Sequence, residues 1–218
     1  NTYRMWSPTL VGEQIELLAE RYGIGNLKIV DEMHVLNKRH VEGICDEIFR
    51  RGLGDRLNIW AYARVDTVKW PDLLDKMRRA GYRFLALGIE AADSAVRDGQ
   101  DKNFSDTQII KTVRAIQDAG INVIANYMFG LEGDTLESMQ RTLDLALELR
   151  TAWANFYPTM IYPGSRLYAD AVKAGRPVPE PWAAYAPLGY DCVPYAPEGL
   201  TPAEVLRFRD MAFLRYFG

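Results

Sequence analysis

The sequence predicts an α/β fold built from repeated strand–helix units, as in a βα barrel whose first strand is missing. The chain opens with a helical pattern that no strand precedes, and the first four helices each end at a glycine and lead into a short apolar run. Such alternation specifies parallel βαβ units, whose ligands bind where the strands end. The terminating glycines are Gly23, Gly52, Gly81 and Gly120.

Composition is typical of one globular core. The 218 residues are 48% hydrophobic and 25% charged, and the net charge of −3 gives no broad electrostatic footprint for nucleic acid. No apolar run reaches the roughly 20 residues that span a bilayer, and the residues after Asn1 have neither the charged n-region nor the apolar h-region of a signal peptide. We therefore expect a cytoplasmic protein, or a piece of one, with no membrane partner.

Capping residues mark where the helices begin. Ser7 precedes Pro8, Asn37 precedes the second helix, Pro71 opens the third, and Thr201 is placed to cap the last. The predicted helices cover residues 8–22, 38–51, 71–80, 106–118, 135–149 and 165–174, with a final helix from 202 onward.

Apolar runs between these helices predict the strands, and most of them end in polar residues. A long loop is expected over 91–104, before the fourth full-length helix. The predicted strands cover residues 27–30, 58–63, 82–89, 121–128 and 152–160.

The chain is expected to divide into a barrel portion, 1–175, and a proline-rich wrapping segment with a C-terminal helix, 176–218. Five parallel strands do not close an ordinary barrel, so the open edge needs a further strand or stays open. Residues upstream of Asn1 are the favoured source, ahead of a partner chain or an open sheet.

Charged residues at three strand ends are candidates for ligand contact. Asp31 and Glu32 could hold an amino group or serve as acid and base, or could only contact the next helix. Arg64 and Asp66 could contact a ligand or form an ion pair that fills the barrel mouth. Glu90 follows a strand with small residues on one face, which indicates space for a ligand hydroxyl or amine.

The turn from Gly130 to Asp134 could bring backbone groups against a flat ligand or an anion. Tyr127, Tyr157 and Tyr162 could line the mouth of the barrel, although most strand aromatics should be core.

Metal ligation within the chain is not expected. His34 and His40 are the only histidines and lack metal-ligand spacing, and Cys45 and Cys192 are too few for a four-cysteine site. The chain has no nucleophile elbow, P-loop or dinucleotide-binding fingerprint.

The order of these motifs resembles the radical S-adenosylmethionine (radical SAM) superfamily over roughly residues 1–168. The resemblance implies a partial (β/α)6 TIM-like barrel that holds SAM across its strand ends, with the first strand outside this chain. It is closest to the branch that often carries an upstream cobalamin-binding domain. The motifs are Tyr3-Arg4-Met5-Trp6-Ser7-Pro8, Val30-Asp31-Glu32, Leu36-Asn37, Ala63-Arg64-Val65-Asp66, Gly88-Ile89-Glu90-Ala91-Ala92, Asp101-Lys102, Phe129-Gly130-Leu131-Glu132-Gly133-Asp134 and Tyr162-Pro163-Gly164-Ser165.

The resemblance assigns contacts to SAM but no catalytic residue. Asp31 and Glu32 stand at the methionine amine, and Glu90 at the ribose or methionyl portion with Arg64 beside it. Lys102 stands at the methionine carboxylate. Asn126, Tyr127 and the Gly130–Glu132 turn would lie along the adenine, although the usual proline of that turn is absent. The expected cofactor-binding residues are therefore Asp31, Glu32, Arg64, Glu90, Lys102, Asn126, Tyr127, Gly130, Glu132 and Tyr162.

The family's three-cysteine loop, which binds a [4Fe–4S] cluster, is not among the 218 residues. We therefore expect a complete parent enzyme that generates a 5′-deoxyadenosyl radical, takes electrons from a donor such as flavodoxin or ferredoxin, and acts on a small molecule. Cobalamin-dependent methyl transfer is one expected reaction. This chain alone should not cleave SAM.

Two alternatives stay open. The first is a barrel without a cluster that only binds SAM or acts as a scaffold. The second is a metal-free βα-barrel lyase or isomerase that uses Glu90, Asp66 and Lys102 as acid–base groups.

Overall fold

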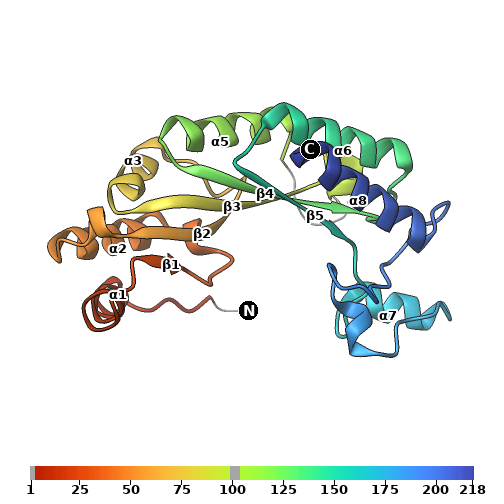
Figure 1. Cartoon of the computed structure of the whole chain (residues 1–218), viewed down its shortest axis with the longest axis horizontal. Coiled ribbons are helices and arrows are strands. Elements are labelled where there is room, and N and C mark those ends of the chain that lie inside the picture. The colour runs from red at the N-terminus through yellow and green to blue at the C-terminus, as the bar shows by residue number, and fades with distance from the viewer. Residues whose placement is uncertain (1–2, 99–103) are drawn as a thin grey trace. The chain divides into compact units, whose positions relative to one another are not determined.

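The computed structural model describes residues 3–98 and 104–218, which form two compact units. The first unit contains Asn1–Gly88, Thr107–Ala125 and Thr151–Trp153, and the second contains Ile89–Asp106, Asn126–Arg150 and Ala154–Gly218. Figure 1 labels the elements, which are α1 (Pro8–Tyr22), β1 (Asn26–Lys28), α2 (Lys38–Arg50), β2 (Asn58–Arg64), α3 (Pro71–Arg79), β3 (Tyr82–Glu90), α4 (Ser94–Asp98), α5 (Asp106–Asp118), β4 (Asn122–Phe129), α6 (Leu136–Leu149), β5 (Trp153–Pro158), α7 (Arg166–Lys173) and α8 (Pro202–Phe217).

The strands form one five-stranded sheet in the order β1-β2-β3-β4-β5. β1 pairs with β2 and β2 with β3 in parallel, and Arg64 lies opposite Gly88 where the β2–β3 pairing ends. Buried and half-exposed residues alternate along β2 and β4, so one face of each strand packs into the core. This confirms the predicted α/β class, a partial barrel of parallel strands.

Local capping chemistry sets the helix boundaries as predicted. The Ser7 hydroxyl accepts the amide of Leu10 at 3.2 Å, and the Asn37 side chain accepts the amide of His40 at 3.2 Å. The four terminating glycines all have positive φ.

One helix lies where the sequence predicted only a loop. The short α4 falls within residues 91–104, and the Asp93 carboxylate caps it by accepting the amide of Ala95 at 3.0 Å. Five residues are too few to show a helical period, so the pattern could not reveal this helix.

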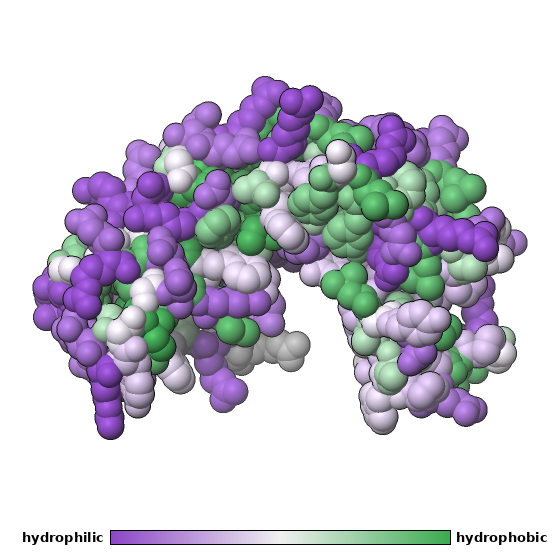
Figure 2. Space-filling model, in the orientation of Figure 1, coloured by the Kyte–Doolittle hydropathy of each residue, from purple (hydrophilic) through white to green (hydrophobic). Residues whose placement is uncertain are grey.

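The second unit has an aromatic core. Phe129 of β4 and Phe156 of β5 stack with their ring centroids 5.6 Å apart, and α8 adds Phe208 and Phe213 edge-on to these rings. The same helix leaves Leu214 and Phe217 exposed, and Figure 2 shows hydrophobic residues gathered over it.

The first unit buries a polar pair within its apolar core. His34 lies in the 3₁₀ helix His34–Leu36, and its Nε2 is 2.8 Å from the hydroxyl of Tyr82 at the start of β3. Both side chains are buried, so each satisfies the other's polar atom. The pair ties the segment after Asp31 and Glu32 to the sheet.

The proline-rich stretch is irregular, as predicted, apart from the 3₁₀ helix Trp182–Tyr185. The 1–175 and 176–218 domain division stays a prediction. Within the described ranges, every helix is too short or too polar to cross a membrane.

His34 should make stability fall in mild acid. Burial lowers its pKa from 6.5 to about 4, while the Asp31 charge opposes that shift and the His40 charge adds to it. The unfolded chain therefore binds the extra proton between pH 6.5 and 4, so stability is complete above pH 6.5 and falls below it. We expect His34 to remove about 2–3 kcal/mol of unfolding free energy by pH 4.

Urea unfolding at pH 7 and pH 4.5 measures this effect. His34→Gln should flatten the loss relative to the unmutated chain. His40→Gln is the comparison and should flatten it less, because burial also lowers the pKa of His40 but this side chain is only half-buried. An equal pH slope in the wild type and His34→Gln would assign the acid sensitivity to other groups.

Candidate functional site

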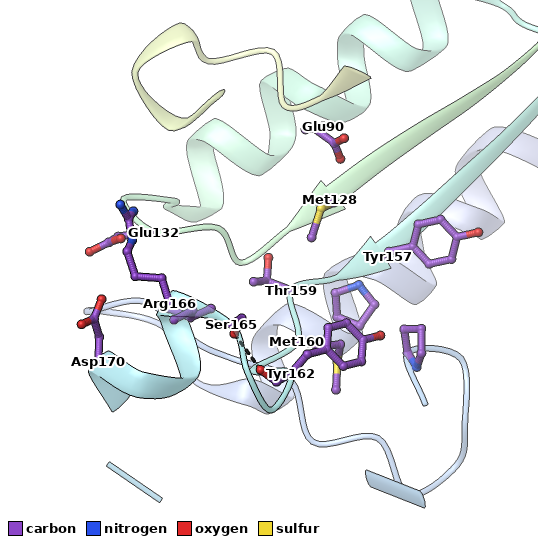
Figure 3. Close-up of a pocket in the computed structure, with 13 residues that line it drawn as sticks. Glu90, Met128, Glu132, Tyr157, Thr159, Met160, Tyr162, Ser165, Arg166 and Asp170 are labelled. Atoms are coloured by element: carbon purple, nitrogen blue, oxygen red, sulfur yellow. Dashed lines mark hydrogen bonds between the residues drawn. The ribbon is translucent and has the colours of Figure 1, made fainter. Parts of the chain in front are cut away.

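A cavity of about 530 Å³ lies within the second unit, at the ends of β3, β4 and β5 (Figure 3). Met128 projects from β4 and Tyr157 from β5, because both occupy the half-exposed positions of their strands. The amide and the hydroxyl of Thr159 both donate to the carbonyl of Phe129, at 2.8 and 3.1 Å, which fixes the end of β5 against the end of β4.

Polar groups lie along one part of this cavity, and apolar groups along another. Glu90 lies at the end of β3, Glu132 in the loop after β4, and Arg166 and Asp170 on α7. Thioether, aromatic and proline side chains line the rest, namely Met128, Tyr157, Pro158, Met160, Tyr162 and Pro187. An apolar cavity with a few convergent polar groups is the usual form of a small-molecule site.

Glu90 has an unusual backbone. Its φ is +68°, and the amide of Ala91 donates to the carbonyl of Ile89 at 3.1 Å, so residues 89–91 form a γ-turn of positive φ. This turn is rare and strained for a residue with a side chain. It ends β3 and directs the Glu90 carboxylate toward Met128 and Thr159 (Figure 3). Strain retained at a cavity is typical of functional positions.

The turn after β4 is held by the buried carboxylate of Asp134, a residue of the predicted turn for which the sequence indicated no separate role. Asp134 accepts the amide of Leu131 at 3.0 Å and the hydroxyl of Ser138, and burial raises the pKa of Asp134. Gly130 is enclosed by this unit as well, because a Cβ there would lie 3.0 Å from Val205 Cγ1 and 3.2 Å from the Tyr195 carbonyl. Close packing therefore accounts for Gly130 in this turn.

Tyr127 does not line the mouth as the sequence suggested. Its ring is fully buried and stacks on Phe156 at 5.4 Å, on the core face of β4. Burial raises the pKa of Tyr127. Its neighbour Asn126 has the opposite orientation and accepts from the Asn155 amide at 2.9 Å. Strand alternation therefore leaves Asn126, and not Tyr127, on the face that Met128 shares.

Tyr162 lines the cavity, as expected, and is 46% exposed. Ser165 fixes the loop at this point, because its amide and hydroxyl donate to the Tyr162 carbonyl at 3.0 and 2.7 Å. Arg166, Asp170 and Met160 were not predicted for the site. Met160 lies in the irregular loop after β5, where no sequence period indicates which side chains turn inward. Arg166 and Asp170 lie on α7, which was predicted as a helix, but the sequence did not indicate that these two side chains line the cavity.

Asp31 and Glu32 line a different cavity, of about 410 Å³, within the first unit. Asp31 accepts from the Tyr3 hydroxyl and, at 3.0 Å, from the amide of Met33. Burial and the nearby Asp31 charge raise the pKa of Tyr3. Both acids, which are adjacent in the sequence, line this cavity together with His34 and His40, and their predicted ligand contact stays a prediction.

Arg64 forms a two-bond ion pair with Asp66, at 2.9 and 3.0 Å. The sequence had left two interpretations open for these residues, ligand contact and an ion pair, and the structure shows the ion pair. Lys102, expected at the methionine carboxylate, lies outside the described residues.

Neither cysteine is suited to hold metal. Cys45 and Cys192 are buried, and burial raises the pKa of Cys45 to about 12 and also raises that of Cys192. In residues 3–98 and 104–218, no group of three or more His, Cys, Asp or Glu is arranged to hold a metal ion.

A parallel βα sheet with a polar and aromatic cavity at its strand ends places the chain among the βα proteins of the partial-barrel class. The protein-family model described as "Radical SAM superfamily" matches residues 1–146 of this chain. This match covers more than half of the sequence, so the chain belongs to the radical SAM superfamily.

Two curated relatives each share less than 30% identity with this chain over the aligned residues. The anaerobic magnesium-protoporphyrin IX monomethyl ester cyclase of Cereibacter sphaeroides is 28% identical over 169 residues, which cover 77% of this chain and 28% of that protein. The bacteriochlorophyllide d C-8(2)-methyltransferase of Chlorobaculum tepidum is 21% identical over 207 residues, covering 85% of this chain and 42% of that protein. The chain thus spans less than half the length of either relative.

Solved structures share the fold. The radical SAM methyltransferase TsrM of Kitasatospora setae, with cobalamin and a [4Fe–4S] cluster bound, has a TM-score of 0.67 and 20% identity, covering 90% of this chain and 39% of that one. The cobalamin-dependent radical enzyme OxsB, with aqua-cobalamin and SAM bound, has a TM-score of 0.61 and 16% identity, covering 80% of this chain and 26% of that one.

Gly130→Ala should be more destabilising than the same change three residues later. Gly130 has φ +76° and close neighbours, whereas Gly133 has φ +83° with nothing within 4 Å of the place that a methyl group would take. We expect a loss of about 1 kcal/mol for Gly133→Ala from conformation alone and about 2 kcal/mol or more for Gly130→Ala. Chemical denaturation of both variants tests this, and equal losses would mean that Val205 and Tyr195 yield to the methyl group.

Glu90→Gly should stabilise the fold. Glycine adopts positive φ without the strain that a side chain introduces, so we expect a gain of about 0.5–1 kcal/mol, reduced by any contacts that the Glu90 side chain makes. Glu90→Ala, which keeps the strain, is the matched control and should not be stabilising. A less stable glycine variant in thermal melts would show that the γ-turn is not under strain.

Proposed function

We propose that this chain is the SAM-binding core of a radical SAM enzyme and that SAM binds in the cavity at the ends of β3, β4 and β5. The observation that carries the proposal is Glu90, held in a strained turn and directed into that cavity. Membership of the radical SAM superfamily favours SAM as the ligand, and the polar and apolar lining of this cavity supports SAM binding there.

The cavity lining fits SAM. A volume of about 530 Å³ lies within the range of small-molecule sites. Carboxylates such as Glu90 and Glu132 can accept from ribose hydroxyls or an ammonium group and are attracted to a sulfonium charge. The flat adenine ring can pack on thioether and aromatic groups, here Met128, Met160 and Tyr157.

The contribution of these residues is binding and orientation. SAM beside a reduced [4Fe–4S] cluster supplies radical chemistry, and the protein positions the reacting groups and excludes water. Glu90 would orient the ribose, and Asn126, fixed by Asn155, would present its amide to the adenine edge. The described thiols do not fit the cluster, so we derive no step through it from this chain.

The contacts of Asp31 and Glu32 to the methionine amine, and of Lys102 to its carboxylate, stay predictions of the resemblance, because the two acids line the other cavity and Lys102 lies outside the described residues. The reaction of the complete protein is a further proposal. The methyltransferases and the cyclase among its relatives favour methyl transfer, with cobalamin, or ring closure on a small organic substrate. Such an enzyme requires a reducing partner such as flavodoxin or ferredoxin.

Equilibrium binding of SAM to the complete protein, reconstituted anaerobically with iron and sulfide, tests the assignment. Glu90→Gln should raise the Kd for SAM about tenfold or more, because it replaces a charged acceptor with a neutral one. Glu148→Gln is the matched control, since Glu148 is exposed on α6 and lines no cavity described above. An unchanged Kd for Glu90→Gln would contradict the proposed contact.

A further inference from the structure

Arg97, on the short helix α4, is completely buried. A buried guanidinium is unfavourable unless its donors are well paired, and an apolar residue of similar size often serves stability as well or better. Within the described part of the chain, its Nε has no hydrogen-bond partner. Stability alone therefore gives little reason for an arginine at this place.

The hydrogen bonds of Arg97 converge on the backbone that follows Glu90. Its Nη1 donates to the carbonyls of Ala91 and Ala92, at 2.6 and 2.9 Å. Its Nη2 donates to the carbonyl of Phe104 at 2.6 Å, and Nη1 also lies 3.1 Å from an Asp106 carboxylate oxygen. One rigid, planar group thus fixes two consecutive carbonyls and ties them to the start of α5.

Those two carbonyls belong to the exit of the strained turn. Ala91 is the last residue of the γ-turn centred on Glu90, and Ala92 is the next residue. A backbone conformation of this kind persists only where the surrounding structure holds it. The Arg97 guanidinium is buried beside this segment and donates to both carbonyls.

Two other contacts stabilise the segment that follows Glu90 less than Arg97 does. The amide of Ala92 donates to the Thr142 hydroxyl at 3.0 Å, and Asp93 pairs with Arg141 at 2.5 Å. The Arg141 side chain is 47% exposed, and exposed ion pairs contribute little. Neither contact reaches the Ala91 carbonyl, so Arg97 has no described substitute there.

We propose that Arg97 is a positioning residue for Glu90: through the Ala91 and Ala92 carbonyls it keeps the γ-turn that directs the Glu90 carboxylate into the cavity. This inference rests on the proposed function, in which Glu90 contacts SAM. Arg97 itself is buried and touches no ligand. Because Arg97 also donates to the carbonyl of Phe104, the route through Glu90 is the part of this proposal that the double variant below tests.

The first test compares Arg97→Lys with Arg141→Lys in the complete, reconstituted protein. Lysine keeps the charge but places one nitrogen where arginine places a planar fork, so it cannot hold both ends of the segment. We expect Arg97→Lys to raise the Kd for SAM about tenfold and Arg141→Lys to leave it within twofold. Equal effects would mean that any disturbance of the loop weakens binding, and would overturn the proposal.

Non-additivity separates a positioning role from a general structural one. If Arg97 acts through Glu90, the Kd of the Glu90→Gln and Arg97→Lys double variant should match that of Glu90→Gln within about twofold. Effects that multiply would overturn the inference and leave the proposed function intact. If Glu90→Gln alone leaves the Kd unchanged, the proposed function fails first, so the two failures are distinguishable.

A second readout needs no ligand. Glu90→Gly should raise the thermal midpoint of the unmutated protein, because it releases the strain. It should give no gain in the Arg97→Lys background, where the turn is free to relax. An equal gain in both backgrounds would show that Arg97 does not hold the turn. If Arg97→Lys does not fold, Arg97→Gln, which keeps two donors without charge, takes its place in both experiments.

Discussion

The alternation of side chains along β4 and β5 decides what the second unit can do. Phe129 and Phe156 lie on the face of these strands that packs against α8. The side chains that alternate with them, such as Met128 on β4 and Tyr157 on β5, therefore lie on the opposite face. The aromatic core and the cavity therefore lie on opposite faces of the same two neighbouring strands. A slip of one residue would place Met128 in the core and expose an aromatic ring, so the aromatic stack also preserves the site.

Local chemistry made most of the fold predictable. Caps such as Ser7 and Asn37 and the helix-ending glycines act over a few residues, and the structure confirms them. The prediction that Tyr127 lines the mouth was wrong, because the sequence of a strand does not indicate which of its faces packs into the core when both faces carry apolar residues. The turn at Glu90 and the arginine that holds it depend on contacts between distant backbone groups, which no sequence period records.

Glu90 and Arg97 depart from ordinary rules at the same place. One is a side-chain-bearing residue in a backbone conformation that suits glycine, and the other is a charge without access to water. Asp134 of the same unit follows the expected pattern, because its buried carboxylate is hydrogen-bonded within its own turn. Departures that cluster beside a cavity indicate that geometry at the ligand was retained at the expense of stability.

The buried thiols determine when this chain reacts with thiol reagents. Cys45 and Cys192 are shielded from solvent and hold their protons at neutral pH, so they should react slowly with alkylating reagents while the fold is intact. Alkylation of either thiol would then require the fold to open around it. Because Cys45 lies on α2 in the first unit and Cys192 in the proline-rich stretch of the second, their labelling rates should report the opening of each unit separately.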